Sequence, residues 1–278
     1  MSFFIQNWSE NVTFCDYKCI YSDDKSLINN ASMVLFHGKN MNSKSVPIEN
    51  LTDSQLKVYI ILESPLNAIV DNKMPANFFD LFVSYRKDSD VHMYYDMFKE
   101  IEEKEANYMG YEVWDQKEVQ KIAFNKSELL LQFVSNCNTD SKRELYLKEL
   151  EKNANVTVVG HCGKTKCGRN IDCEKNLIKS HYFYLAFENT ICAEYVTEKF
   201  FRMKELIVPV VLKRSVIEGI APEGSFIAAD DFKSAQELVE FLEETSADRT
   251  LNGQRSTTKV RFAQKRRVNY VKSHGKEC

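Results

Sequence analysis

The sequence predicts an α/β fold in which parallel strands form sheets covered by helices. Two observations lead to this prediction. In the second half of the chain, short apolar runs alternate with helix-favouring stretches, and strand–helix–strand repeats of this spacing build parallel sheets. The chain has 278 residues, and at roughly 150 residues per domain this length corresponds to about two domains.

Short apolar runs bounded by polar residues predict the strands, because buried parallel strands are nearly continuous in Val, Ile and Leu. The expected strands cover residues 33–36, 58–62, 129–134, 156–159, 183–187, 208–212 and 226–228.

Capping boxes, in which a Ser side chain and a Glu three residues later satisfy free backbone N–H groups, predict two helix starts. Ser141 with Glu144 opens a helix to about residue 152, and Ser234 with Glu237 opens one to about residue 244. The remaining expectations are a helix over 194–204, a charged helix-favouring stretch over 97–107, a loop over 66–77 and a domain boundary near 112–126.

Composition excludes several classes of protein. The net charge is −3 and the pI about 6.0, so the chain as a whole lacks the basic footprint of a nucleic-acid-binding protein. Its apolar runs are shorter than the roughly 20 residues of a membrane-spanning helix. The N-terminus shows no signal peptide.

Cysteine content and glycosylation acceptors favour the secretory pathway. The chain has eight cysteines, several of them closely spaced, as in disulfide-containing secreted proteins. Asn-x-Ser/Thr acceptors, which exceed the number expected by chance, occur at Asn7, Asn11, Asn30, Asn50, Asn125 and Asn155. The alternative is a cytosolic protein with reduced thiols.

Common cofactor motifs are absent or imperfect. No G-x-G-x-x-G follows a strand, which argues against a nicotinamide dehydrogenase, and Gly160–Thr165 has the wrong glycine spacing for a P-loop. Cys162, Cys167 and Cys173 could bind zinc, but their loose spacing favours disulfides. Asp88-Ser89-Asp90 is either a chelator of a metal-bound diphosphate or an ordinary acidic turn.

The densest group of polar side chains follows the strand at 183–187. Ligands of open α/β sheets bind at the carboxyl ends of strands, and helix N-termini attract phosphate. Lys199 supplies positive charge there, Asn189 and Glu198 suit sugar hydroxyls, and Arg143 could complete a cationic clamp. Ordinary surface polarity of a helix is the alternative interpretation.

Glu63 ends an apolar strand and precedes Ser64-Pro65. Catalytic groups often lie where a sheet edge meets a loop. A carboxylate that only stabilises the turn would show the same pattern, so both interpretations stay open from these residues alone.

Several motifs, in order along the chain, resemble those of the α1,3/α1,4-fucosyltransferases. The segment FYLAFENTICAEYVTEKFF at 183–201 is similar to the family signature FYLSFENS…DYVTEKL. The other matching stretches are Cys15 and Cys19 with residues 31–37, the ESP element at 63–65, the YRxDSD-like element at 85–90, the SN…R element at 135–143, and the runs 208–212 and 225–227.

The resemblance implies a GT-B-like fold, with two Rossmann-like domains facing a central cleft. It places an acceptor-side domain over residues 1–120, a GDP-fucose-binding domain over 121–245 and a divergent basic tail over 246–278. The implied reaction is an inverting transfer of L-fucose from GDP-fucose to a GlcNAc hydroxyl of a glycoprotein or glycolipid glycan, with an α1,3 linkage as the family expectation.

The family assigns roles to matching residues. Glu63 becomes the base, because an acceptor hydroxyl needs one at neutral pH. Arg143 and Lys199 hold the diphosphate, while Glu188 stabilises an oxocarbenium-like transition state. By the same resemblance, Asn189, Tyr195 and Glu198 are expected to bind the nucleotide and the fucose.

The expected partners and location follow from the same resemblance. The partners are GDP-fucose and a GlcNAc-containing glycan, with no nucleic acid. No cofactor or metal is required, although stimulation by a divalent cation stays open. Family members are Golgi enzymes with a lumenal catalytic domain, and membrane contact is expected only through an anchor that this sequence does not contain.

Departures from the family pattern leave a second hypothesis open. Residues 202–207 replace a small-residue helix, Lys213 replaces a glycine, and the aromatic ending of the family is replaced by the basic tail. A catalytically impaired member that binds a glycan or a partner enzyme is therefore the alternative to an active transferase.

Overall fold

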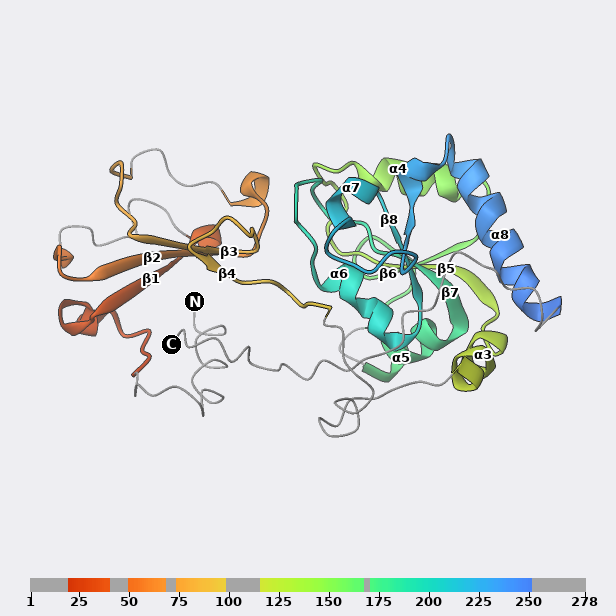
Figure 1. Cartoon of the computed structure of the whole chain (residues 1–278), viewed down its shortest axis with the longest axis horizontal. Helices are drawn as coiled ribbons and strands as arrows, with labels where there is room; N and C mark the ends of the chain where they lie inside the picture. Colours follow the sequence, from red (N-terminus) through yellow and green to blue (C-terminus); the bar gives the residue numbers. More distant parts are fainter. Residues whose placement is uncertain (1–19, 41–49, 69–73, 99–115, 168–170, 252–278) are drawn as a thin grey trace. The chain divides into compact units, whose positions relative to one another are not determined.

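The computed structural model describes residues 20–40, 50–68, 74–98, 116–167 and 171–251. These residues form two compact units, the first ending at Tyr94 and the second beginning at Tyr95 (Figure 1). Each unit contains one parallel sheet, which confirms the predicted α/β class. The boundary expected near 112–126 lies partly outside the described residues and stays a prediction.

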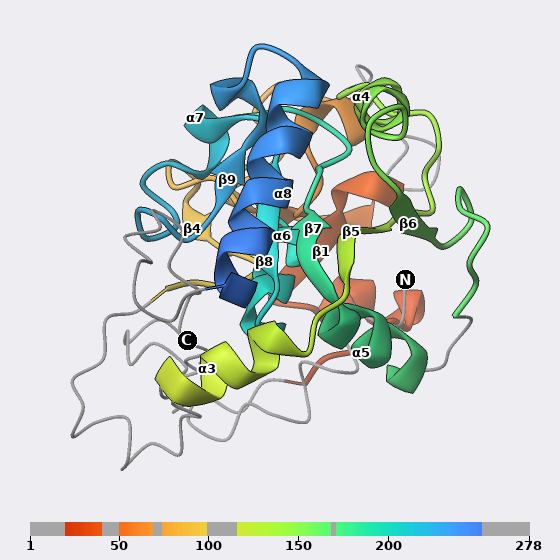
Figure 2. The same cartoon turned by 90° about the vertical axis from the view of Figure 1, so that its right-hand side faces the viewer.

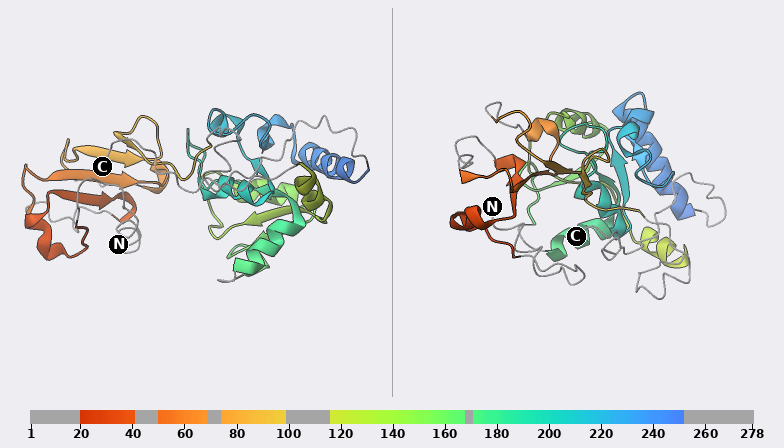
Figure 3. Two further views of the ribbon diagram at one scale, coloured as in Figure 1. Left: turned by 60° about the horizontal axis from the view of Figure 1, so that its bottom comes forward. Right: turned by 60° about the vertical axis from the view of Figure 1, so that its left-hand side comes forward.

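The first unit has a four-stranded sheet in the order β1-β2-β3-β4, with every neighbouring pair parallel. The strands lie side by side in the left view of Figure 3. Their bounds, with those of the short 3₁₀ turns, are η1 Lys25–Asn30, β1 Met33–His37, η2 Gly38–Asn40, β2 Leu56–Ile61, η4 Pro65–Asn67, β3 Leu81–Ser84 and β4 Val91–His92. The sequence predicts β1 and β2 but misses β3 and β4, which are short and partly exposed.

Aromatic side chains hold the first sheet together. Phe78 and Phe79, just before β3, pack their rings against Phe36 of β1 with centroids 5.6 Å apart in both cases. Tyr59 of β2 lies 5.1 Å from Phe79. Such edge-to-face and tilted contacts add to the energy of apolar burial, so adjacent strands share one aromatic cluster.

The second unit has a five-stranded sheet in the order β6-β5-β7-β8-β9, and all of its neighbouring pairs are parallel. Helices cover both faces (Figure 2). The strands are β5 Glu128–Phe133, β6 Val156–Val159, β7 His181–Leu185, β8 Val208–Val211 and β9 Ile227–Ala228. The helices are α3 Gln116–Phe124, α4 Arg143–Leu150, α5 Ile171–Ser180, α6 Glu198–Phe201, η5 Arg202–Glu205, α7 Arg214–Ile217, η6 Ala229–Asp231 and α8 Ala235–Leu251.

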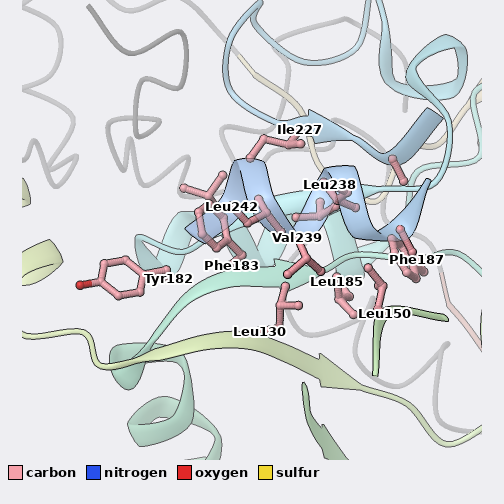
Figure 4. Close-up of a cluster of buried hydrophobic side chains, with 14 residues drawn as sticks. Leu130, Leu150, Tyr182, Phe183, Leu185, Phe187, Ile227, Leu238, Val239 and Leu242 are labelled. Carbon is pink, nitrogen blue, oxygen red and sulfur yellow. The ribbon is translucent and has the colours of Figure 1, made fainter. Parts of the chain in front are cut away.

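Two apolar cores lie on opposite faces of this sheet. Leu130 points toward α4 and α8, whereas its neighbour Leu131 points toward α5 and α6, and neither is exposed. Figure 4 shows Leu238 and Leu242 of α8 over Leu130 and Phe183 of the sheet. A sheet covered on both faces explains why its strands are apolar without alternation.

The predicted capping box at Ser141 is wrong. Helix α4 begins after Lys142, whose backbone is left-handed (φ 54°) and provides no side-chain cap. Ser141 Oγ donates instead to the carbonyl of Glu188 at 2.7 Å, and Glu144 accepts from the N–H and the hydroxyl of Thr139. A tertiary hydrogen bond from Ser141 and a different local contact of Glu144 have replaced the expected capping box.

Other element boundaries also differ from the prediction. The helix expected over 194–204 begins only at Glu198, because Thr197 is its N-cap, and it becomes a 3₁₀ turn after Phe201. The strand expected over 183–187 lies two residues earlier, and α8 extends beyond residue 244. The Ser234–Glu237 box is confirmed, since the N–H of Glu237 donates to Ser234 Oγ at 3.1 Å.

Three helices were not predicted: α3, α5 and α7. Helix α5 follows the cysteine-rich segment, where the sequence shows no strong start signal. Residues 97 and 98 are irregular, and the rest of the stretch expected to favour a helix lies outside the described residues.

Candidate functional site

The strand order of the second unit identifies where a ligand would bind. The chain passes from β5 to β6 on one side, then returns to β7 on the other side of β5 and continues to β8 and β9. In open α/β sheets the crevice outside such a reversal, at the carboxyl ends of the two strands, is the usual ligand site. Here those strands are β5 and β7. The loops that leave them are residues 134–142 and 186–197.

Hydrogen bonds join these two loops directly. The N–H of Ser141 donates to the carbonyl of Asn189 at 3.0 Å, and Arg143 Nη1 donates to the carbonyl of Phe187 at 2.6 Å. Each loop contains a non-glycine residue in the left-handed region, Lys142 (φ 54°) and Glu194 (φ 62°). Backbone conformations of this kind cost energy and concentrate at functional sites.

Arg143 is a buried cation at this reversal, with only 4% of its surface exposed. Its Nη2 donates to the carbonyl of Asn136 at 3.1 Å, while Nε has no hydrogen-bond partner among the described residues. Burial lowers its pKa against the opposing influence of Glu188, yet a guanidinium stays protonated at neutral pH. Arg143 therefore retains charge and an unused donor.

A cavity of about 870 Å³ borders Arg143 on the flank of α4. Its floor includes Gln132 and Val134 of the β5 side, and its walls are α4 and the edge strand β6. This volume lies in the usual range for small-ligand sites. Arg143 is the predicted site residue that lines it.

Lys199 and Glu188 form a second charged group at the reversal. Lys199 Nζ lies 3.3 Å from Glu188 Oε2, 2.9 Å from Thr197 Oγ1 and 3.1 Å from Glu198 Oε1. Glu188 is buried, and its carboxylate also accepts the N–H of Thr197 at 2.8 Å. Burial raises the pKa of Glu188, although Lys199 and the hydrogen bonds from Thr197 oppose that rise.

Glu198 lies at the exposed side of this group, with 59% of its side chain accessible. Desolvation alone would raise its pKa, but the charge of Lys199 and the hydrogen bond from Lys199 hold the pKa below its ordinary value. An ionised, accessible carboxylate is a suitable acceptor for sugar hydroxyls.

Asn189 and Tyr195 complete the predicted set in this unit. The buried Oδ1 of Asn189 has no hydrogen-bond partner in the described part of the chain, so it can accept from a ligand. Tyr195 is almost completely covered by protein. The structure thus gathers Arg143, Glu188, Asn189, Tyr195, Glu198 and Lys199 in the two loops and adjoining helices of the reversal.

Glu63 lies in the first unit, directly after β2. Its carboxylate is 3.3 Å from Lys39 Nζ, and 27% of its side chain is exposed. The neighbouring Ser64 is fully buried and Pro65 opens the turn η4. Glu63 thus follows the carboxyl end of a parallel strand, as the sequence predicts.

Two disulfides lie beside the reversal in the second unit. Cys137–Cys162 joins the loop after β5 to the loop after β6, and Cys167–Cys173 links residue 167 to the first turn of α5. All three of Cys162, Cys167 and Cys173 are therefore in disulfides, as the sequence favours, and both pairs argue against a zinc site. Cys15 and Cys19 lie outside the described residues.

Both carboxylates of the acidic triplet at 88–90 are already bonded to neighbouring residues. Arg86 Nε donates to Asp88 Oδ1 at 2.7 Å, and Asp90 Oδ2 accepts the N–H of Phe82 at 2.8 Å. Across the described ranges, no group of three or more His, Cys, Asp or Glu side chains could hold a metal ion. The expected independence from a metal stays a prediction.

Sequence reasoning gave no role to Thr197 and expected Ser141 only to cap a helix, although both organise the site. Thr197 is the N-cap of α6 and contacts Glu188 and Lys199. A threonine just before an acidic residue at a helix start is a recognisable cap signal. The contact of Ser141 with Glu188 spans 47 positions, and local sequence gives no sign of it.

Arg202, one of the departures from the family pattern, has a packing role. Its guanidinium lies 4.6 Å from the centroid of Phe133 and 3.4 Å from a carboxylate oxygen of Glu174. It therefore links η5 to β5 and α5. Among the described residues, no helix is both long and apolar enough to cross a membrane.

Comparison with known proteins agrees with this arrangement. The family description "Glycosyltransferase family 10 (fucosyltransferase) C-term" matches residues 123–254, and "Fucosyltransferase, N-terminal" matches residues 3–96. A crystal structure of an α1,3-fucosyltransferase with GDP-fucose is similar in fold, with a TM-score of 0.50 and 17% identity over 79% of this chain and 67% of that chain. This likeness confirms the GT-B type of fold.

Curated relatives point the same way. Alpha-(1,3)-fucosyltransferase fut-1 of Caenorhabditis elegans is 33% identical over 84% of this chain and 52% of its own length. Glycoprotein 3-alpha-L-fucosyltransferase A of Drosophila melanogaster is 30% identical over 81% of this chain and 43% of its own. The chain spans about half the length of these relatives. With both family regions matched in order, the chain belongs to glycosyltransferase family 10, the fucosyltransferases.

Proposed function

We propose that this chain transfers L-fucose from GDP-fucose to a hydroxyl of GlcNAc in a glycan, with inversion and an α1,3 linkage. The observation that supports it most is the pair of cations, Arg143 and Lys199, held against residues 187–188 at the reversal of the second sheet. A departing diphosphate needs such compensation of its negative charge. Similarity to a fucosyltransferase solved with GDP-fucose supports the choice of donor.

The reaction is a single displacement. The acceptor oxygen forms a bond to the anomeric carbon of fucose while the bond from that carbon to the diphosphate oxygen breaks. The proton of the acceptor hydroxyl passes to Glu63, and GDP leaves with the electron pair toward Arg143 and Lys199. Asn189 Oδ1 and the Glu198 carboxylate accept hydrogen bonds from hydroxyl groups of GDP-fucose. Glu188 is placed to balance the charge of Lys199.

The proposal needs no metal or other cofactor, because two cationic side chains supply the charge that a bridging metal would provide. If a divalent cation stimulates the reaction, adding a chelator would lower the rate of fucose transfer. A location in the Golgi lumen is supported by the two disulfides. It is also supported by exposed acceptor asparagines at Asn30, Asn50, Asn125 and Asn155.

Release of GDP from GDP-fucose tests this function. Purified protein is mixed with GDP-fucose and GlcNAc-terminated acceptors, and GDP formation is compared with and without acceptor and in the presence of EDTA. We expect acceptor-dependent GDP release and a fucosylated product visible by mass spectrometry. The position of fucose in that product decides between linkage to O3 and to O4.

A different outcome favours the second hypothesis. The departures after Lys199 are the reason to keep a glycan- or enzyme-binding role as the alternative. Folded protein that binds GDP or a glycan but gives no product with any GlcNAc-terminated acceptor would support that role. The Glu63→Gln variant is the matched control, since background hydrolysis would be equal in both proteins.

A further inference from the structure

Thr197 lies at the centre of the charged group in the second unit. Its hydroxyl oxygen is 2.8 Å from both carboxylate oxygens of Glu188 and 2.9 Å from Lys199 Nζ. A hydroxyl has one hydrogen to donate and lone pairs to accept. It therefore donates to the carboxylate and accepts from the ammonium at the same time, and it is 1% exposed.

The three contacts of Lys199 Nζ differ in exposure. An ammonium has three N–H donors, and here three oxygens surround it: Thr197 Oγ1 and Glu198 Oε1 accept hydrogen bonds, and Glu188 Oε2 forms an ion pair. Thr197 and Glu188 are buried, whereas Glu198 is largely exposed. An incoming anion would therefore replace the contact with Glu198 most easily, and the two buried contacts would remain.

Fixing this ammonium in advance has an energetic consequence. A lysine side chain carries roughly 2 kcal/mol of rotamer entropy, and restraining it before binding removes part of that cost from ligand affinity. Glu188 contributes an ion pair, which is less directional than a hydrogen bond. The hydroxyl of Thr197 adds a second, directional contact from the same buried position.

We propose that Thr197, together with Glu188, is a positioning residue that fixes the Lys199 ammonium for the diphosphate of the donor, while Glu198 is the contact released on binding. This proposal rests on the proposed function. It gives Glu188 a role through Lys199, which differs from the stabilisation of fucosyl charge expected from the family resemblance.

A double-mutant cycle on GDP affinity tests the proposal. Thr197→Val removes the hydroxyl and keeps the shape, and Thr197→Ser keeps the hydroxyl. Calorimetry should show about a tenfold loss of GDP affinity for Thr197→Val, the size of one hydrogen bond to a charged group. The serine variant should keep most of the affinity. In a Lys199→Ala background, Thr197→Val should cause little further loss, because the group it positions is gone.

The matched control is Thr245→Val. Thr245 is a buried threonine of α8 whose hydroxyl donates to the Phe241 carbonyl at 2.7 Å, away from the site. Loss of the Thr245 hydroxyl should lower thermal stability without changing GDP affinity or KM for GDP-fucose. A full loss of affinity from Thr197→Val in the Lys199→Ala background would overturn the proposal, as would a serine variant as weak as the valine variant.

Glu188→Gln covers the case in which Thr197→Val fails to fold. The amide keeps an acceptor for Thr197 and loses the charge that faces Lys199. We expect weaker GDP binding that is not additive with Lys199→Ala. A lower kcat with unchanged GDP affinity would instead assign Glu188 to fucosyl charge and contradict the positioning role. Wild-type protein that neither binds GDP nor turns over would reject the proposed function itself, which separates the two failures.

Discussion

The two units each contain a lysine–glutamate pair after the carboxyl ends of parallel strands, with the same separation of 3.3 Å between nitrogen and oxygen. In the first unit the pair is open to water: 57% of the Lys39 side chain and 27% of the Glu63 side chain are exposed. In the second unit the values are 19% for Lys199 and 9% for Glu188.

Burial decides what each pair can do. An exposed ion pair contributes about 0–1 kcal/mol and exchanges with water, so proton uptake by Glu63 would sacrifice at most about that much energy from its ion pair with Lys39. A buried pair is costly to break, because it leaves an uncompensated charge in the protein. Lys199 is therefore held in place, as its proposed contact with a diphosphate requires. The same type of ion pair is therefore compatible with the proposed base, Glu63, in the first unit and with the proposed binding group, Lys199, in the second.

Glu63→Gln should give the largest effect on turnover. The amide keeps the shape of the carboxylate but cannot take the acceptor proton, and a positioned base contributes about 10²–10⁴-fold. We expect kcat to fall by about that factor, measured by GDP release at saturating donor and acceptor. Near-native kcat in this variant would place the base elsewhere. Lost stability with normal kcat in the folded fraction would support a turn-stabilising carboxylate.

Lys199→Ala should give the next largest effect, and it should act on binding and stability together. Removing one partner of a buried pair costs about 3–5 kcal/mol of unfolding free energy, and loss of one transition-state contact lowers turnover by about 10²–10³-fold. Lys199→Arg keeps the positive charge at some geometric cost, so it should be much less damaging in both urea unfolding and donor kinetics. Equal activity of the two variants would argue against contact with phosphate.

Lys39→Met should give the smallest effect. The exposed pair predicts that the free energy of unfolding changes by less than about 1 kcal/mol, and that the change shrinks further in high salt. Urea unfolding at two salt concentrations measures it. A loss as large as that of Lys199→Ala would show that exposure does not distinguish the two pairs.

Much of the second unit could be predicted from sequence, because its strands are buried on both faces. Leu130 and Leu131 belong to one apolar run because each faces a covering layer of helices. The first unit was harder to predict, since β3 and β4 are short and partly exposed: β3 has only a three-residue apolar run, Leu81–Val83, and β4 consists of two exposed residues. The Ser234 cap could be predicted because its partner Glu237 is three residues away.

The site itself could be predicted only in part. Lys199 and Asn189 follow a recognisable strand, and the structure places them at the reversal as expected. The hydrogen-bond partners within the site could not be predicted, because they depend on contacts between segments that are distant in the sequence. Ser141 bonds to the Glu188 carbonyl rather than capping its own helix, and Thr197 joins two charged groups. A sequence shows the residue types in such a network but not their partners.

The central claim is a division of roles, with the donor held by the second unit and the acceptor proton taken by the first. Calorimetric titration of GDP into wild-type, Glu63→Gln and Lys199→Ala proteins tests it most directly. The account predicts wild-type GDP affinity in Glu63→Gln despite its loss of turnover, and strongly weakened binding in folded Lys199→Ala. Weakened GDP binding in Glu63→Gln together with normal binding in Lys199→Ala would contradict it.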